Sequence, residues 1–224
     1  MHDADPIVRL SARSNLRLGI MGGAFDPIHI AHLVTAQEAL LQFELDEVVF
    51  LPSGQPPHKK RKLAQAEFRY LMTAVATASH PRFSVSRFEI ERSGVGYTVD
   101  TLEYMKGILM PETQLFFITG ADAVLDILTW KDPSGVLGLC TLIAATRPGF
   151  DLSRLSTALS SLGRDVVGPG PDSRVKVMEV PGLDISSSMI RERLAAGLPV
   201  RYLVPEPVCQ LIEKSGAYRP AAQA

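Results

Sequence analysis

The strongest constraint on the fold is a repeated alternation between short apolar runs and longer amphipathic stretches along the chain. The apolar runs have the length of strands and are bounded by turn residues, whereas the stretches between them have the length of helices. This alternation is typical of a parallel sheet whose strands are joined by crossover helices. The sequence therefore predicts an α/β fold, a doubly wound (Rossmann-like) parallel sheet with helices on both faces and with C-terminal helices after the last strand.

The periodicity also places the individual elements. Strands are expected at Leu16 to Met21, Glu47 to Leu51, Phe83 to Val85, Gln114 to Thr119, Leu139 to Ala145 and Val175 to Val180. Helices are expected at Ile30 to Phe43, Ala66 to Ser79, Val99 to Ile108, Ala123 to Leu128, Leu152 to Leu162, Ser187 to Ala196 and Glu206 to Lys214. In such folds the ligand crevice lies beyond the carboxyl ends of the strands, so motifs that directly follow strands are the functional candidates.

A chain of 224 residues suits one domain, which we place at residues 17–218, with short tails at 1–16 and 219–224. Residues 1–16 contain no long apolar block, so they resemble neither a signal peptide nor a membrane anchor and are interpreted as a flexible tail. The most apolar stretch, Val136 to Ala145, is about half the ~20 residues that a spanning helix needs. It is interpreted as a buried strand with its lead-in.

Charge and cysteine content narrow the class of partner and the location. The formal net charge is only -1, so no overall positive field attracts a polynucleotide, and we expect neither a nucleic-acid nor a membrane partner. Cys140 and Cys209 lie far apart and outside any C-x-x-C spacing, which argues against a disulfide framework and a thiolate metal cluster. A cytoplasmic location is expected, and homo-oligomers remain possible.

The segment from Gly22 to His32 directly follows the first expected strand and leads into the first expected helix. The adjacent glycines Gly22 and Gly23 permit positive φ and a close approach of the backbone to a ligand. Asp26 and Pro27 predict a tight turn before the helix. The segment is therefore expected to form the ligand-facing corner of the first strand and helix.

His29 and His32 are three positions apart, so both imidazoles are expected on one face at the start of this helix. A helix N-terminus attracts anions, and imidazole N–H groups can bind phosphate oxygens whose charge grows in a transition state. One capping and one core histidine is the ordinary explanation of such a pair. A zinc site is another, although no Cys or acidic residue at helical spacing completes it. The position at a strand end favours phosphoryl or nucleotidyl transfer.

A second motif begins the helix after the last expected strand, and it contains Ile185, Ser186, Ser187, Ser188 and Arg191. Serines are good N-caps, and an arginine in the next turn can reach back to the same helix terminus. Capping alone would explain this pattern.

Three central segments also follow strands or begin helices. Lys59 lies in a loop rich in proline and lysine, which suits a phosphate clamp as well as a solvated charged loop. Tyr97 and Thr98 begin a helix with Thr98 as the expected cap. Gly120, Ala121 and Asp122 follow a strand, with Trp130 eight residues later. Arg147, at the end of the next strand, is a further candidate phosphate ligand. A single tryptophan is usually a core residue.

In this order the motifs resemble those of the nicotinate mononucleotide adenylyltransferase family, within the nucleotidyltransferase superfamily that has an H-x-G-H element. The resemblance extends over about Leu16 to Tyr218. The first motif is similar to G-G-x-F-D-P-x-H-x-G-H, with Ala31 where the family usually has glycine. The second is similar to I-S-S-T-x-x-R, with Ser188 in place of threonine.

The resemblance implies roles for individual residues. The catalytic residues would be His29, His32 and Arg191. ATP would contact Gly22, Gly23, Ala24, Phe25, His29, His32, Gly120, Asp122, Ile185, Ser186, Ser187 and Arg191. The mononucleotide would contact Lys59, Tyr97, Thr98, Trp130 and Arg147, with its carboxylate near the Thr98 backbone and its pyridine stacked on Trp130.

The implied reaction transfers the adenylyl group of ATP to nicotinate mononucleotide, giving nicotinate adenine dinucleotide and pyrophosphate in NAD biosynthesis. Mg²⁺ would be bound mainly through the ATP phosphates, because it tends to keep its waters. Other acceptors stay open, namely nicotinamide mononucleotide, phosphopantetheine or, with CTP, an alcohol phosphate, as does an inactive nucleotide-binding regulator. A dehydrogenase and a P-loop ATPase are disfavoured, because the chain has no G-x-G-x-x-G at the first strand and no Gly-Lys pair.

Overall fold

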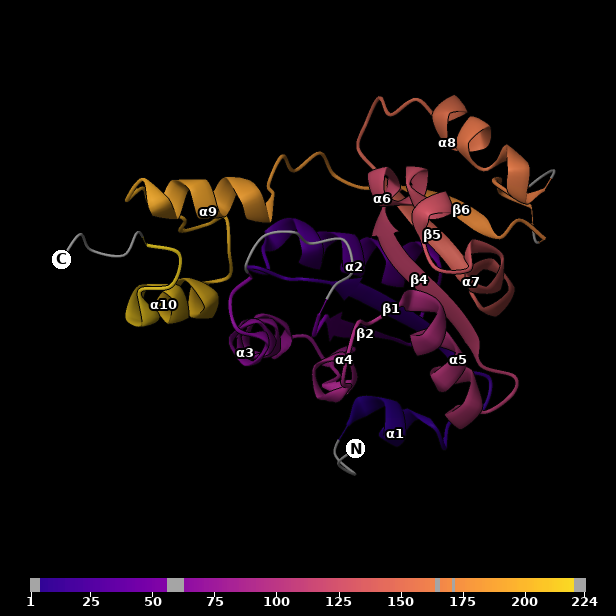
Figure 1. Ribbon diagram of the computed structural model, residues 1–224, viewed down its shortest axis with the longest axis horizontal. Coiled ribbons are helices and arrows are strands. Elements are labelled where there is room, and N and C mark those ends of the chain that lie inside the picture. The colour runs from indigo at the N-terminus through magenta and orange to yellow at the C-terminus, as the bar shows by residue number, and fades with distance from the viewer. Residues whose placement is uncertain (1–4, 56–62, 164–165, 171, 220–224) are drawn as a thin grey trace.

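The computed structural model describes residues 5–55, 63–163, 166–170 and 172–219, and it has a parallel sheet between two layers of helices (Figure 1). The strands are β1 (Arg17–Gly23), β2 (Glu47–Pro52), β3 (Phe83–Val85), β4 (Gln114–Gly120), β5 (Thr141–Thr146) and β6 (Val175–Glu179). Their order is β3-β2-β1-β4-β5-β6, and every pairing is parallel. The predicted doubly wound fold is confirmed, and the strand order reverses between β1 and β4, where such folds bind ligands.

The helices follow the expected alternation and add several short elements. They are α1 (Pro6–Leu10), α2 (Ile30–Gln42), α3 (Ala66–Thr77), α4 (Phe88–Glu91), α5 (Thr98–Ile108), α6 (Ala121–Leu125), α7 (Pro133–Leu139), α8 (Ser153–Ala158), α9 (Ser187–Ala195) and α10 (Glu206–Ser215). Two 3₁₀ turns, η1 (Ile127–Thr129) and η2 (Ser160–Leu162), follow α6 and α8. In Figure 1, α9 and α10 lie together at one side of the molecule, beyond α2 and α3.

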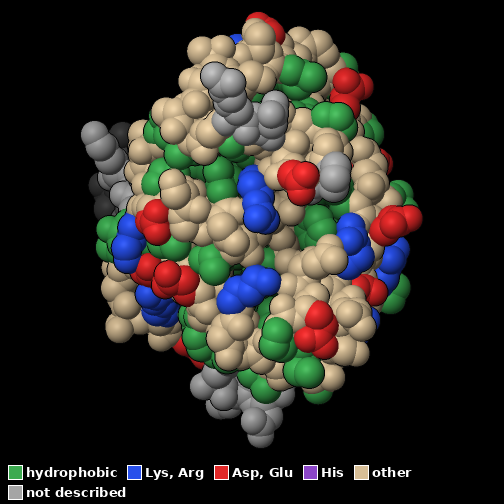
Figure 2. All heavy atoms as spheres, turned by 90° about the vertical axis from the view of Figure 1, so that its right-hand side faces the viewer, with side chains coloured by type: hydrophobic (Ala, Val, Ile, Leu, Met, Phe, Trp, Pro, Cys, Tyr) green, Lys and Arg blue, Asp and Glu red, His purple; other side chains and the backbone are tan. Residues whose placement is uncertain are grey.

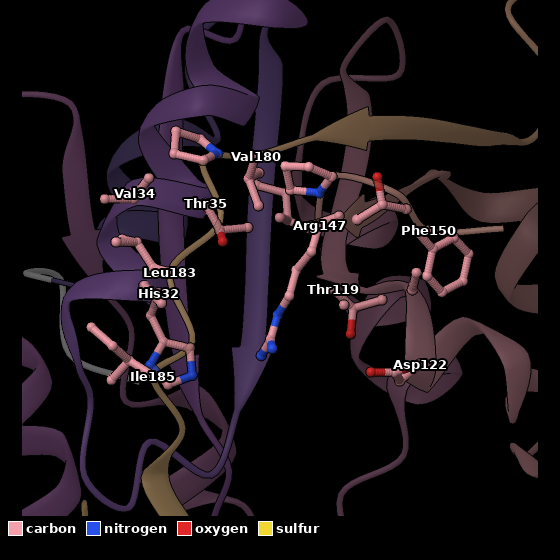
Figure 3. Close-up of a pocket in the computed structure, with 18 of the residues that line it drawn as sticks. His32, Val34, Thr35, Thr119, Asp122, Arg147, Phe150, Val180, Leu183 and Ile185 are labelled. Atoms are coloured by element: carbon pink, nitrogen blue, oxygen red, sulfur yellow. The ribbon is translucent and has the colours of Figure 1, made fainter. Parts of the chain in front are cut away.

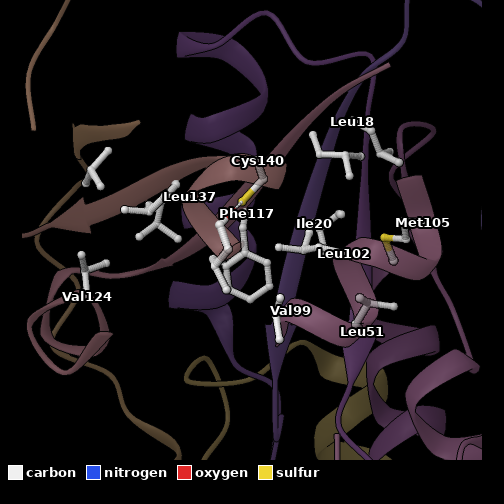
Figure 4. Close-up of a cluster of buried hydrophobic side chains, with 14 of the residues drawn as sticks. Leu18, Ile20, Leu51, Val99, Leu102, Met105, Phe117, Val124, Leu137 and Cys140 are labelled. Atoms are coloured by element: carbon white, nitrogen blue, oxygen red, sulfur yellow. Dashed lines mark hydrogen bonds between the residues drawn. The ribbon is translucent and has the colours of Figure 1, made fainter. Parts of the chain in front are cut away.

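Side chains alternate between two buried clusters, one on each face of the sheet. On β4, Leu115 and Phe117 belong to the cluster covered by α1, α5 and α7, part of which Figure 4 shows. The neighbouring residues Phe116 and Ile118 belong to the other cluster, which is covered by α2, α3 and α10. Because helices cover both faces of the sheet, its central strands are apolar over most of their length, which explains the apolar runs in the sequence.

The interpretation of residues 1–16 as a flexible tail is wrong for the described residues of that segment. Asp5 caps α1, and its carboxylate also accepts hydrogen bonds from the Ser86 hydroxyl at 2.8 Å and the Arg87 N–H at 3.1 Å. Ile7 and Leu10 are fully buried beneath the sheet. A helix of five residues contains too few apolar positions to show a periodicity, so the sequence pattern did not predict it. Its stability comes from tertiary contacts with the sheet.

The interpretation of Val136 to Ala145 as a strand with its lead-in is also wrong in its first part. Residues Pro133–Leu139 form α7, and the strand begins only at Thr141. Asp132 caps this helix by accepting the Gly135 N–H at 2.9 Å, and Pro133 occupies its first turn. Asp followed by Pro is a helix-start pattern, and the apolar residues after it concealed the boundary.

The surface and the cysteines are unremarkable. On the face shown in Figure 2, acidic and basic side chains are interspersed among neutral and apolar ones. Cys140 and Cys209 are both buried and neither forms a disulfide. Within the described ranges, no helix has the length and apolar character needed to cross a membrane.

Candidate active site

The corner between β1 and α2 forms as the first motif predicts, but the backbone conformation differs in detail. Gly22 and Gly23 are the last residues of β1, and neither has a positive φ, whereas Phe25 does, with φ 44°. Glycine is needed at these two positions because a side chain would crowd the neighbouring aromatic rings. A Cβ on Gly23 would lie 3.1 Å from the Phe25 ring, and one on Gly22 would lie 3.0 Å from the Phe117 ring.

His29 and His32 lie together at the start of α2, which begins at Ile30 as expected. Their rings stack with centroids 3.6 Å apart. The His29 backbone N–H donates to Nδ1 of His32 over 3.2 Å, so the proton of a neutral His32 ring is on Nε2. The predicted placement of both imidazoles at one helix terminus is therefore observed, with His29 as the residue that precedes the first turn.

Burial keeps both imidazoles uncharged at neutral pH. It lowers the pKa of His29 to about 4, and its Nδ1 is buried with no hydrogen-bond partner among the described residues. Burial, reinforced by the neighbouring His29, also lowers the pKa of His32 well below its usual value. Neutral imidazoles can donate one hydrogen bond each without the repulsion that two adjacent cations would suffer.

A cleft of about 700 Å³ opens beside the histidine pair, at the carboxyl ends of β1, β4 and β5. His32 lies on one side of it, and Thr119 and Asp122 lie on the other (Figure 3). The Arg147 side chain extends between them and binds the exposed Asp184 carboxylate at 2.6 Å. Gly120, Ala31 and Ile185 also line the cleft, so it contains residues from both predicted nucleotide motifs.

The second motif contacts the first motif directly. Ser186 caps α9 by accepting the Met189 N–H. The Ser187 hydroxyl donates to the Pro27 carbonyl at 2.8 Å, and Nη1 of Arg191 donates to the Asp26 carbonyl at 2.7 Å. Ser186, Ser187 and Arg191 do not line the cleft in this structure, but Ser187 and Arg191 secure the turn that leads to the histidines.

A buried arginine that sequence reasoning missed secures the same corner. Arg69 of α3 is 1% exposed, and its guanidinium donates to the carbonyls of Ala24, Ser53, Gly54 and Ala64. It thereby joins the ends of β1 and β2. A signal was present in the sequence, because Arg69 shares the buried face of its helix with Met72 and Thr73 at i+3 and i+4.

A second pocket of about 500 Å³ adjoins the cleft, and the two share Gly22 and Thr119. Its walls are largely aromatic and apolar, and we call it the aromatic pocket. They include Phe117, Tyr97 and Trp130, whose ring meets that of Phe117 edge-on at 6.0 Å between centroids. Tyr97, Thr98 and Trp130 are thus brought together as predicted, and Gly23 and Ala24 line this pocket rather than the cleft.

The start of α5 forms one end of the second pocket. Its cap is Tyr97 and its first helical residue is Thr98, so the expected Thr98 cap is wrong by one position. Asp100 binds Lys131 at 2.7 Å, which lowers the pKa of its carboxyl group, and Lys131 lies over the Tyr97 ring. Glu89, which sequence reasoning missed, accepts the Thr101 hydroxyl, and burial raises its pKa.

Three predicted site residues remain, namely Phe25, Arg147 and Lys59. Phe25 is buried, and its ring packs edge-on against His32 with centroids 5.1 Å apart. Arg147 lines the cleft beside the histidines rather than the aromatic pocket. Lys59 lies outside the described residues. No group of three His, Cys, Asp or Glu suited to a metal ion occurs in the part of the chain that the structure describes.

The fold and this site together define a class, the nucleotidyltransferases with an α/β sheet and a histidine pair after the first strand. Residues 20–193 match the family model described as cytidylyltransferase-like. A protein from Moorella thermoacetica named "Probable nicotinate-nucleotide adenylyltransferase" is 52% identical over 208 residues, which cover 91% of this chain and 92% of that protein. One of the same name from a Thermoanaerobacter species is 50% identical over 205 residues, covering 91% and 95%.

Solved structures show the same fold at lower identity. Nicotinic acid mononucleotide adenylyltransferase from Plasmodium falciparum, complexed with NaAD, superposes with a TM-score of 0.71 at 20% identity, covering 91% of this chain and 97% of that one. With these similarities, the chain belongs to the cytidylyltransferase-like family and, within it, to the nicotinate-nucleotide adenylyltransferase family.

Proposed function

We propose that this protein transfers the adenylyl group of ATP to nicotinate mononucleotide, forming nicotinate adenine dinucleotide and pyrophosphate. One observation carries the proposal. Two pockets of different chemistry adjoin at Gly22 and Thr119, beside a pair of neutral imidazoles at a helix N-terminus. A reaction that joins two nucleotides needs two such pockets in contact, with hydrogen-bond donors beside the cleft that receives the triphosphate.

In this proposal ATP occupies the cleft and the mononucleotide occupies the aromatic pocket. The 5′-phosphate of the mononucleotide attacks the α-phosphorus of ATP, a new P–O bond forms, and the bond to the β-phosphate oxygen breaks to release pyrophosphate. The attacking phosphate is already a nucleophile, so the protein has to align it and stabilise charge rather than remove a proton. His29 and His32 would donate to the oxygens of the α-phosphate, and Arg147 would bind phosphate at the cleft.

Mg²⁺ would enter with ATP as part of the substrate. The cleft offers two separate acidic side chains, Asp122 and Asp151, instead of a cluster of ligands. This donor set suits an ion that keeps its waters and is bound mainly by the triphosphate. Under the same proposal the enzyme is cytoplasmic, which is compatible with its two unpaired, buried thiols.

Steady-state turnover with MgATP tests the proposal, with pyrophosphate release measured against nicotinate mononucleotide, nicotinamide mononucleotide and phosphopantetheine. We expect kcat/KM to be highest for nicotinate mononucleotide. A higher value for another acceptor would reassign the second pocket. Binding of ATP without turnover of any acceptor would favour a regulator that has lost catalysis.

A further inference from the structure

The turn that carries the catalytic histidines is secured mainly from the C-terminal part of the chain. Ser187 and Arg191 of α9 bind its two central carbonyls. The Ile30 N–H at the start of α2 donates to the Leu203 carbonyl at 3.1 Å. The side chain of Asp26 is bound by a residue still further along, because the Tyr218 hydroxyl donates to Oδ1 of Asp26 at 2.7 Å. This last contact joins residues 192 positions apart.

Tyr218 is directed toward the turn by its backbone. Gly216 ends α10 in the left-handed conformation, and Tyr218 is also left-handed, with φ 69°. A residue with a side chain seldom adopts such a φ, so contacts of the side chain have to hold it there. The ring packs against the apolar cluster to which Phe25 and Ile28 belong, and its hydroxyl reaches Asp26.

The hydrogen bond is buried and polarised. Asp26 is 1% exposed, and its Oδ1 also accepts the Ala64 N–H at 3.3 Å. Burial, together with the Asp26 carboxylate, raises the pKa of Tyr218, whereas the nearby Arg191 and Arg69 oppose this shift. The phenol therefore remains a neutral donor in the physiological range, and a carboxylate acceptor makes its hydrogen bond stronger than a neutral one.

We propose that Tyr218 is a positioning residue for adenylyl transfer. It orients the Asp26–Pro27 turn, and that turn sets the placement of His29, three residues after Asp26, and of the His32 ring that stacks on it. Tyr218 lines neither pocket, so it acts through the histidines and not on a substrate. The kinetic test of this inference rests on the proposed function, because it measures turnover. The spectroscopic test does not, because it compares histidine signals alone.

The test compares Tyr218→Phe with Tyr202→Phe in the full-length protein. Tyr202 is a matched control, because it is 86% exposed and loses the same hydroxyl. We expect Tyr218→Phe to lower kcat about tenfold, the effect of one misplaced hydrogen bond, while both KM values stay within about twofold. In ¹⁵N spectra of labelled histidine, the imidazole signals of His32 should shift in Tyr218→Phe and stay unchanged in Tyr202→Phe.

The proposal is overturned if Tyr218→Phe retains kcat within twofold, or if it loses activity through lower thermal stability with unchanged imidazole signals. If Tyr218→Phe does not fold, Asp26→Asn replaces it. Its amide oxygen still accepts the phenol, so we expect a loss of only about threefold together with shifted imidazole signals. Unshifted signals in Asp26→Asn would overturn the proposal as well. A wild-type protein that turns over no mononucleotide would contradict the proposed function but would leave the spectroscopic comparison intact.

Discussion

The two pockets at the carboxyl edge of the sheet are assembled in different ways. Most of the aromatic pocket comes from one continuous stretch, residues 89–131, in which α5, β4 and η1 follow one another. The cleft beside the histidines draws on four separate segments, and its histidine corner is secured by α9 and Tyr218. In the aromatic pocket a ring would be held by stacking, which tolerates small displacements. In the cleft, hydrogen bonds to a developing charge need donors at fixed positions, so its histidine corner requires anchoring from distant segments.

This contrast predicts that changes in the cleft act on kcat and changes in the aromatic pocket act on KM.

The largest effect is expected for His32→Ala, which removes a donor beside the reacting phosphate. It should lower kcat by 10²–10³-fold, comparable to the loss of one donor to a developing oxyanion. Pyrophosphate release at saturating substrates measures this, with Val34→Ala as a control that alters the same cleft without removing a polar group. Near-normal turnover in His32→Ala would reject the assigned role.

A second prediction concerns the cost of keeping the imidazoles neutral. The pKa of His29 is about 4 in the folded protein and about 6.5 when exposed, so between these pH values the unfolded chain binds more protons. The free energy of unfolding should therefore fall by as much as about 3 kcal/mol as the pH is lowered from 6.5 to 4. Urea unfolding at several pH values measures this. His29→Gln should flatten the dependence more than His80→Gln, and equal curves for both variants would contradict it.

The aromatic pocket should respond through binding. Trp130→Ala removes a wall of that pocket and should raise KM for the mononucleotide about tenfold, because aromatic stacking contributes about 1 kcal/mol or more. KM for ATP and kcat should change little. Trp130→Phe keeps an aromatic face and should recover much of the loss. An equal rise in both KM values would indicate that the pockets are not as separate as their construction suggests.

The smallest effect is expected at the cleft rim. Asp184 is 93% exposed at its side chain, so its ion pair with Arg147 is largely screened by water. Asp184→Asn should change the free energy of unfolding by less than about 0.5 kcal/mol. Thermal or urea unfolding measures it, and a loss above about 1 kcal/mol would show that the pair holds the cleft in shape.

The strands could be predicted closely because buried parallel strands leave a continuous apolar run, and β2 is an example, since Glu47–Pro52 is buried throughout and the expected strand was Glu47 to Leu51. Short helices could not. Pro6–Leu10 has one apolar turn, and only its contacts with the sheet show that it is folded. Motif order alone also did not reveal that Ser187 and Arg191 are bound to the turn before the histidines, and their contact with the ATP phosphates stays a prediction.

By itself, the sequence determined the doubly wound order of elements and the histidine pair at the first strand end, because both depend on residues close together in the chain. Lys59 as a phosphate-binding residue stays a prediction. Only the tertiary structure decided that Arg69 and Tyr218 anchor the corner that carries the histidines and that two pockets meet at Gly22. These features depend on contacts across as many as 192 positions, which arise when the sheet and its helices pack, whereas the local pattern signals only that Arg69 lies on a buried helix face.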